Sequence, residues 1–374
     1  MGLALLLASG GAWAGLSEEQ PEGPGEPSLR EPVTPLAPDL PTVTPRPRFE
    51  VLPAAVSVVP GVLLHGLGPL VAGDGQTAGR LFLMEGAGLG MILGGGIPIA
   101  LTGASRQLIG PLYAVTLAGV GLLSVSTLSN LYAAVSPAFD PGRVPQRLPP
   151  LELELGYQHV SDPAFRYRHF VTVGARGRLE RVRLEAAAQL SPDEGNLRVR
   201  VGGAYRLFGG LERDRGGADG TSLDVEVAGL VHRYPTEGFL LGGGELGVRG
   251  RLDMARVSPR LAGSFAEMGA GVALQQYAFP GRVDDALFQQ LLFTFGYGVY
   301  LGGRGPFRGE ALLYYDHRKD DFPGGLRVFG GGPAYFGLRG RVFLTPRWGM
   351  SADLQAGSAL VGRVSLVYAW GGEP

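Results

Sequence analysis

The residues best suited to chemistry form one short run, Tyr157-Gln158-His159-Val160-Ser161-Asp162. A histidine close to a serine is a pair used in nucleophilic catalysis, because the imidazole can take the proton of the hydroxyl. His159 and Ser161 are two residues apart, so on a β-strand both side chains lie on one face, with Leu153 and Leu155. The plainer alternative is a polar pair at the end of a strand that forms only hydrogen bonds.

This run resembles the His-x-Ser-Asn motif of outer-membrane lipid hydrolases, such as lipid A deacylases and outer-membrane phospholipases, which carry it on an outward strand face. The resemblance implies Ser161 as the nucleophile and His159 as the base that activates it toward an acyl ester. The run departs from the motif at Asp162, where the family has Asn, and the sequence offers no clear acidic or amide partner for His159.

Composition excludes several other kinds of site. The chain has no cysteine, which excludes disulfides, thiolate metal sites and cysteine nucleophiles. No phosphate-binding loop, zinc spacing or EF-hand run occurs, so we expect no metal and no cofactor. The 33 basic and 34 acidic residues give a net charge of -1, which argues against a nucleic-acid partner.

From Leu151 onward, apolar and polar residues alternate with the period of two that is typical of β-strands. In the clearest segment, residues 291–301, one face is entirely apolar or aromatic. Most segments exceed the average strand of about 5–6 residues and approach the 9–11 or so that cross a membrane when tilted. The expected strands are about 151–160, 168–179, 182–190, 197–207, 222–233, 239–251, 267–278, 287–301, 306–317, 334–344, 347–357 and 361–370.

A soluble β-sandwich or a lipocalin-like barrel would also show this alternation. Strand length, an export signal and the absence of cysteine favour a membrane barrel instead. The links Glu180-Arg181 and Thr345-Pro346 are short, whereas Ser191–Asn196 and Arg318–Pro333 are longer, as expected for a barrel with turns on one side and loops on the other. Aromatic residues near the strand ends would form an interfacial girdle. They are Tyr157, Tyr167, Phe170, Tyr205, Phe208, Tyr234, Phe239, Tyr277, Phe279, Tyr300, Phe307, Trp348 and Trp370.

The even strand count and the aromatic last strand, Val367-Tyr368-Ala369-Trp370, resemble bacterial outer-membrane β-barrel proteins. The resemblance concerns the architecture of residues 151–374 and points to no specific family. It implies a mainly β fold, a transmembrane antiparallel β-barrel of about 12 strands, with the lipid bilayer and the outer-membrane assembly machinery as partners. The chain departs from the pattern because Gly371–Pro374 follow the last aromatic residue.

If the apolar faces point to lipid, the charged faces line the lumen. Two interpretations are open. Mutually paired charges could fill a narrow barrel, or an arginine-lined path could attract a small anionic solute. The expected lumen-facing residues are Arg176, Arg183, Glu185, Arg198, Arg200, Glu226, Arg249, Arg339, Arg341 and Asp353.

The region before the strands divides into three parts. Residues 1–14 are apolar and end in Ala12-Trp13-Ala14, the A-x-A pattern of a cleaved signal peptide. Residues 15–50 contain nine prolines and predict a disordered, Pro-rich periplasmic spacer. Residues 51–149 are apolar and rich in glycine, and residues 150–374 form the predicted outer-membrane barrel.

Within residues 51–149, the windows Leu81–Leu101 and Leu108–Val135 are each long enough to span a bilayer as a helix. The spacings Gly86-x-x-x-Gly90 and Ala114-x-x-x-Ala118 would let two helices approach closely. We therefore expect a helical hairpin that plugs the lumen or packs at the base of the barrel.

Together these features predict an exported, non-enzymatic outer-membrane protein of a Gram-negative envelope, with a structural or small-solute pore role. Two alternatives remain open. One is an outer-membrane lipid esterase or deacylase that uses His159 and Ser161, and the other is an envelope assembly or tethering component that uses the Pro-rich segment.

Overall fold

The computed structural model describes residues 51–371 with several internal gaps. The predicted signal peptide, residues 1–14, and the predicted spacer, residues 15–50, lie outside the described residues. The gaps are residues 104, 106, 136–147, 163–167, 214–219, 236–237, 280–281, 284–286, 302–307, 319–321 and 323–333.

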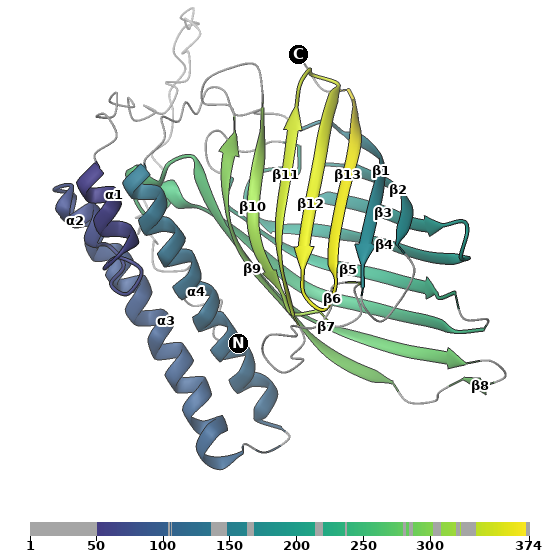
Figure 1. Ribbon diagram of the computed structural model, residues 1–374, viewed down its shortest axis with the longest axis horizontal. Coiled ribbons are helices and arrows are strands. Elements are labelled where there is room, and N and C mark those ends of the chain that lie inside the picture. Colours follow the sequence, from purple (N-terminus) through teal and green to yellow (C-terminus); the bar gives the residue numbers. More distant parts are fainter. Residues whose placement is uncertain are drawn as a thin grey trace, which may run out of the picture. The chain divides into compact units, whose positions relative to one another are not determined.

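Twelve long antiparallel strands form one sheet that closes on itself (Figure 1). Each long strand pairs with the next one along the chain, and β13 pairs with β1 over its whole length. A two-residue strand, β8 (Arg282–Val283), pairs only with the end of β7. The closed 12-stranded barrel confirms the predicted fold class. The long strands are β1 (Leu151–Ser161), β2 (His169–Arg178), β3 (Val182–Ser191), β4 (Asn196–Phe208), β5 (Ser222–Arg233), β6 (Leu240–Asp253), β7 (Ser264–Phe279), β9 (Phe288–Leu301), β10 (Arg308–Asp316), β11 (Tyr335–Phe343), β12 (Trp348–Ala356) and β13 (Leu360–Trp370).

The barrel has two rims. The terminal rim carries the start of β1, the end of β13 and the connection between β6 and β7, which contains the short helices η2 (Met254–Arg256) and η3 (Pro259–Leu261). The loop rim carries the connection of residues 317–334 between β10 and β11. The expected division into short turns and long loops is only partly right, because the terminal rim also carries the long connection of residues 209–221.

Closure gives the sheet an inner and an outer face, and the alternation assigns each residue to one of them. Apolar residues on the outer face are exposed along the barrel wall, for example Val201, Leu246, Leu338, Val364 and Leu366. Between the strand ends, the described outward positions carry no charged residue. The outer wall is therefore an apolar belt.

The expected aromatic girdle is right for some residues and wrong for others. Tyr157, Tyr205 and Trp370 are exposed near strand ends on the outer face. Phe170 is buried instead against Val160 and Val361 inside the barrel, because it lies at an inward position of β2. Tyr300 is also inward, with its ring 5.0 Å from that of Phe265. Tyr167 and Phe307 lie outside the described residues.

Four helices precede the barrel: α1 (Val51–Val58), α2 (Leu67–Val71), α3 (Gly75–Thr102) and α4 (Ile109–Val135). Asp74 caps the start of α3 by accepting a 3.0 Å hydrogen bond from the Thr77 N–H. Gly103 ends α3 in the left-handed conformation, at φ +67°, and its N–H donates to the Ile99 carbonyl. The expected apolar hairpin is confirmed as the antiparallel pair α3 and α4.

The two long helices approach closely, but not through the expected glycines. A Cβ on Gly119 would lie 2.6 Å from the Gly88 carbonyl oxygen, and a Cβ on Gly95 would lie 2.5 Å from the Leu112 carbonyl oxygen. A Cβ on Gly86 or Gly90 would meet nothing within 4 Å. Gly88, Gly95 and Gly119 therefore form the seam, and Gly86 and Gly90 face away from α4.

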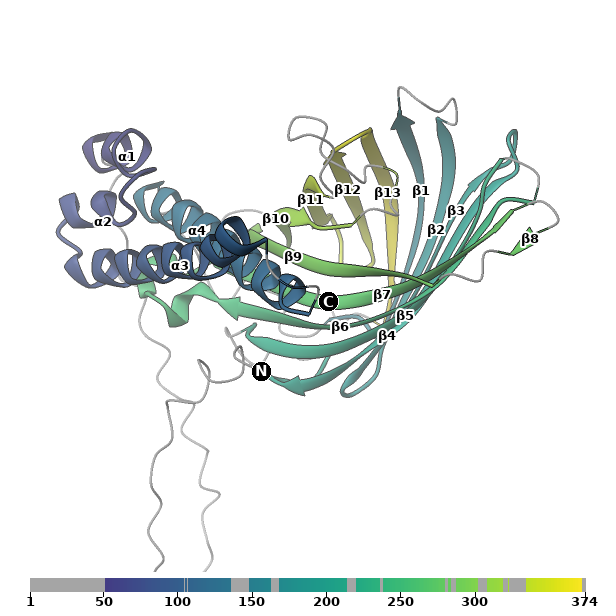
Figure 2. The same cartoon turned by 90° about the horizontal axis from the view of Figure 1, so that it is seen from below.

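The hairpin lies against the outside of the barrel (Figures 1 and 2). Leu117 and Ala118 of α4 pack against the outward rings Phe293 and Phe295 of β9, and a Cβ on Gly121 would lie 3.0 Å from the Phe295 ring. The expectation that the hairpin plugs the lumen or packs at the barrel base is wrong. The small residues of α4 fit the aromatic outer face of β9, whereas the lumen is lined with charged side chains.

The seam predicts a difference between two substitutions to alanine. Gly119→Ala would force backbone apart in α3 and α4, and overpacking of this kind costs about 1–3 kcal/mol. Gly90→Ala, the matched control, adds its methyl group to open space and improves helix propensity. We expect the thermal midpoint of the helical circular-dichroism signal in detergent to fall for Gly119→Ala and not for Gly90→Ala. Equal midpoints for the two variants would contradict the seam.

Candidate functional site

Charged side chains from opposite parts of the barrel meet inside it. Arg251 of β6 lies 2.8 Å from Glu310 of β10, although β7 and β9 separate their strands. Arg341 of β11 lies 2.8 Å from Glu152 of β1 across β12 and β13. Only the concave side of a closed sheet can bring such residues together. The charged face of the strands is therefore the inner face.

Glu152 is the centre of one inner cluster. Its carboxylate lies 2.8 Å from Arg341, 3.1 Å from Arg178 and 3.6 Å from Arg176. Both Glu152 and Arg178 are buried. A buried carboxylate needs cations and hydrogen-bond donors around it, and three guanidinium groups from two strands, β2 and β11, provide them here. This cluster ties β1, β2 and β11 together near the terminal rim.

Arg183 is the centre of a second cluster on β3. It lies 2.9 Å from Glu185, 3.0 Å from Glu226 of β5 and 3.1 Å from Glu212. Glu212 comes from the connection between β4 and β5 and is also buried. The described residue Glu212 of this connection thus lies against the inner charges. Arg206 joins the same cluster through Asp224 at 2.8 Å and Glu212 at 2.9 Å.

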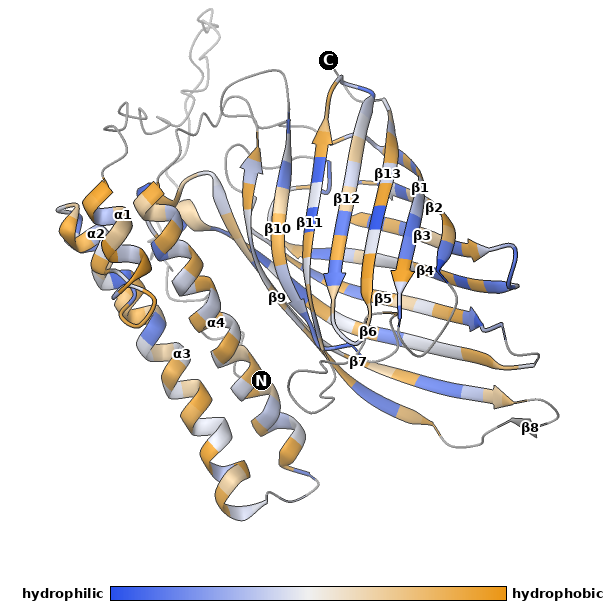
Figure 3. Ribbon diagram, in the orientation of Figure 1, coloured by the Kyte–Doolittle hydropathy of each residue, from blue (hydrophilic) through white to orange (hydrophobic). Residues whose placement is uncertain are grey.

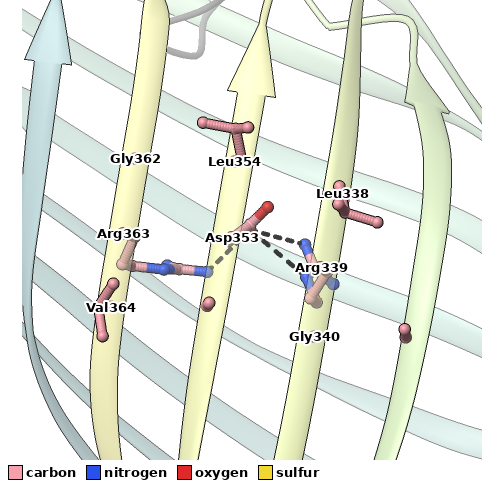
Figure 4. Close-up of a pocket in the computed structure, with 10 residues that line it drawn as sticks. Leu338, Arg339, Gly340, Asp353, Leu354, Gly362, Arg363 and Val364 are labelled. Carbon is pink, nitrogen blue, oxygen red and sulfur yellow. Dashed lines mark hydrogen bonds and ion pairs between the residues drawn. The ribbon is translucent and has the colours of Figure 1, made fainter.

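Asp353 of β12 is the centre of a third cluster (Figure 4). Arg363 and Arg339 point toward it from the two neighbouring strands, at 3.1 and 3.3 Å. The Tyr314 hydroxyl donates a hydrogen bond of 2.9 Å to the same carboxylate. The surrounding strands also line a hollow of about 360 Å³, whose apolar side chains Leu338, Leu354 and Val364 belong to the outward positions.

The most exposed and the most buried side chains of the inner ion pairs differ in the sign of their charge. Among the described ion pairs, the four most exposed side chains are all arginines: Arg176 and Arg200 at 35%, Arg249 at 37% and Arg339 at 50%. Several of their partners are almost fully buried, with Glu152 at 4% and Asp353 at 3%. Two acids are also accessible, Glu185 at 34% and Glu310 at 30%. The most accessible positions of the inner surface are therefore guanidinium groups, and several carboxylates lie beneath them.

Each of the four exposed arginines shares its carboxylate with a second arginine. Glu245 binds Arg200 at 2.8 Å and also binds Arg318. Asp353 binds Arg363 as well as Arg339. Glu152, the partner of Arg176, also binds Arg178 and Arg341. Glu226, the partner of Arg249, also binds Arg183. The exposed arginines are thus not the sole partners of any of these four acids.

An aromatic side chain packs inside the barrel near the loop rim. Phe322, from the connection between β10 and β11, packs into a buried cluster with Val160, Phe170 and Val361. The Arg198 guanidinium lies 5.8 Å from the centre of the Phe322 ring. This aromatic side chain therefore occupies inner space near the loop rim.

The structure brings most of the predicted charged residues into ion pairs and shows several that the sequence prediction missed. Nine of the ten predicted residues take part in ion pairs described above, and Arg198 contacts Phe322. Glu267 of β7, which lies 3.2 Å from Arg251, could have been found from the alternation. Glu212 and Arg318 could not, because they lie outside the strands and no periodicity assigns them a face.

The predicted catalytic pair lies on the outer face near the loop rim. Ser161 is exposed, and the His159 ring lies 5.2 Å from the ring of His169 on β2. His169 in turn shares a hydrogen bond with the Tyr157 hydroxyl. In the part of the chain that the structure describes, no hydrogen bond joins His159 to Ser161, so their catalytic roles stay a prediction. The described residues also contain no group of three or more His, Asp or Glu side chains arranged to hold a metal ion.

Comparisons with known proteins concern the architecture. No protein-family model matches the sequence, and no curated protein matches it either.

The chain is similar to solved outer-membrane β-barrels at low identity. A KdgM porin in complex with disordered oligogalacturonate has 9% identity and a TM-score of 0.36, covering 59% of this chain and 99% of its own. The outer membrane protein Omp33 of Acinetobacter baumannii has 10% identity and a TM-score of 0.32, covering 60% and 100%. The translocator domain of the autotransporter NalP from Neisseria meningitidis has 13% identity and a TM-score of 0.36, covering 59% and 88%.

The clusters predict how two inner acids, one buried and one partly exposed, differ in their effect on stability. Glu152→Gln leaves the buried Arg178 and the partly buried Arg341 without their shared carboxylate, and breaking a buried ion pair costs about 3–5 kcal/mol. Glu310→Gln is the control, because its partner Arg251 keeps Glu267 at 3.2 Å. We expect the faster-migrating folded band on unboiled gels to disappear at a clearly lower temperature for Glu152→Gln than for Glu310→Gln. The opposite order would contradict the assignment of Glu152 as the centre of its cluster.

Proposed function

We propose that this chain is an outer-membrane β-barrel that passes small anionic solutes through its lumen. The single observation that carries the proposal is the exposure pattern of the inner charges. The four most exposed charged side chains of the described ion pairs are arginines, and each shares its carboxylate with another arginine.

The membrane part of the proposal follows from the outer face. Its described positions between the strand ends are uncharged, and large apolar side chains are exposed along it. Strands of 9 to 16 residues are long enough to cross the hydrocarbon layer at the tilt of a barrel. The proposal includes a cleaved signal peptide at residues 1–14. It also includes insertion of the barrel by the outer-membrane assembly machinery of a Gram-negative envelope.

The preference for anions follows from electrostatics. A solute in the lumen meets the accessible guanidinium groups first, and the buried carboxylates lie farther from it. Charged rings at close quarters select ions of opposite sign in narrow pores. Arginine also binds carboxylate and phosphate groups in a bidentate geometry, so small organic anions suit this surface as well as chloride does.

A purely structural barrel is the competing outcome. The ion pairs that cross the barrel, such as Arg251 with Glu310, could leave too little space for any solute to pass. A narrow lumen filled by paired charges would conduct no ions. Conductance therefore separates the two roles.

In a planar bilayer with a potassium chloride gradient, we expect step-like conductance with a reversal potential that favours chloride. The double variant Arg200→Gln with Arg339→Gln should lose most of this preference, because two accessible charges are removed while Glu245 keeps Arg318 and Asp353 keeps Arg363. The matched control, Arg200→Lys with Arg339→Lys, keeps both charges and should retain the preference.

Two results would count against this function. A barrel that inserts and shows no conductance would support the structural role. A barrel that conducts with equal preference in the wild type and in the double Gln variant would show that the exposed arginines do not select the solute.

A further inference from the structure

We propose that the helical hairpin of α3 and α4 is a second membrane-spanning element, which lies in the same bilayer as the barrel and exposes its outer face to lipid acyl chains. The inference rests on the proposed membrane location of the barrel. It goes beyond that proposal because it places the helices in the lipid, outside the barrel wall.

The first argument is that the hairpin extends from one rim of the barrel to the other. At the terminal rim, the Tyr132 hydroxyl of α4 donates to the Ala262 carbonyl oxygen at 2.9 Å, and Thr77 at the start of α3 contacts Ser258. Toward the loop rim, the ring of Tyr113 in α4 packs edge-on against His317, at 5.3 Å. The helix pair therefore occupies the same layer as the strands.

The distance between these contacts fits a bilayer. Nineteen residues separate Tyr113 from Tyr132, and at 1.5 Å of rise per residue this corresponds to roughly 28 Å of helix. The hydrocarbon core of a bilayer is about 30 Å thick. The part of α4 that lies along the barrel wall is thus as long as the apolar layer that the barrel itself would cross.

The second argument is that α4 takes the place that lipid would have over β9. The outward residues Phe293, Phe295 and Tyr297 are 3–6% exposed. The equivalent outward residue Leu246 of β6, away from the hairpin, is 56% exposed. The aromatic row of β9 is buried because the apolar side of α4 covers it. At this part of the wall the barrel therefore contacts a helix where it would otherwise contact lipid.

The third argument is the chemistry of the remaining hairpin surface (Figure 3). Only 17% of the most apolar segment of α3 and 33% of that of α4 are buried, which is unlike the core helix of a soluble protein. On α3, Leu83, Leu93 and Leu101 are exposed. An exposed apolar surface that runs the whole length of two long helices has lipid as its natural solvent.

The one charged residue between Leu81 and Leu101 supports the same conclusion. Glu85 is buried and accepts a 2.8 Å hydrogen bond from the His65 backbone N–H. Its carboxylate is therefore turned away from the exposed surface of α3. Charged groups within the hydrocarbon layer are costly and face the interior of the protein, and Glu85 is buried in this way with a backbone hydrogen bond.

The absence of cysteine makes a clean test possible, because each variant carries one labelled position. We would attach an environment-sensitive fluorophore to Leu93→Cys on α3, to Leu246→Cys on the outer barrel wall and to Gln76→Cys, which is exposed near the terminal rim. Each full-length protein would be reconstituted into phosphatidylcholine vesicles. Brominated acyl chains would report contact with lipid, and iodide would report contact with water.

We expect brominated lipid to remove most of the fluorescence at positions 93 and 246 and iodide to have little effect there. At position 76, iodide should be the stronger quencher. Quenching of position 93 by iodide would place the hairpin in water, and quenching by neither reagent would show that another protein, such as a second copy, covers it. Either result overturns the inference.

Position 246 separates this inference from the proposed function. If brominated lipid fails to quench the fluorophore on the barrel wall, the membrane location of the barrel itself is wrong. If it quenches position 246 and leaves position 93 unaffected, the barrel is in the membrane and only the placement of the hairpin is wrong.

Discussion

The pairing of β1 with β13 is the constraint on which the rest of the structure depends. Eleven residue pairs, from Leu151 opposite Trp370 to Ser161 opposite Leu360, join the first and last strands. This pairing removes both free edges of the sheet and creates an inside and an outside. Charged residues of strands that are distant in sequence can then meet across the lumen, and apolar residues are left on a continuous outer wall.

The two faces satisfy opposite requirements. Inside, carboxylates such as Glu152 and Asp353 are buried among guanidinium groups, while arginines such as Arg339 remain accessible. The most accessible inner charges are thus arginines, while buried acids such as Glu152 and Asp353 are paired beneath them. Outside, the apolar wall is continuous, and it is covered by α4 along β9. A charged lumen and an apolar wall are consistent with a pore through a membrane.

Much of the barrel could be predicted from sequence alone, because alternation is a local property. The predicted strand at residues 287–301 is observed as Phe288–Leu301, and the predicted inner charges do meet in ion pairs. The position of the hairpin could not be predicted, since it depends on the fit between α4 and the rings of β9. The glycine seam was assigned wrongly because several glycine pairs of α3 have helical spacing and only the packed structure selects Gly88 and Gly95. Residues beyond the strand ends, such as Glu212, carry no periodic signal.

Closure of the barrel can be measured directly with a pair of engineered cysteines. Leu155 and Leu366 lie opposite each other on β1 and β13, and opposite residues of an antiparallel pair are within reach of a short thiol crosslink. Leu155→Cys with Leu366→Cys should crosslink within the folded protein in membranes and change the mobility of the denatured, unreduced chain. Leu155→Cys with Leu338→Cys, which places the second thiol on β11, should not. Failure of the first pair to crosslink, or equal crosslinking of both pairs, would contradict the closed barrel.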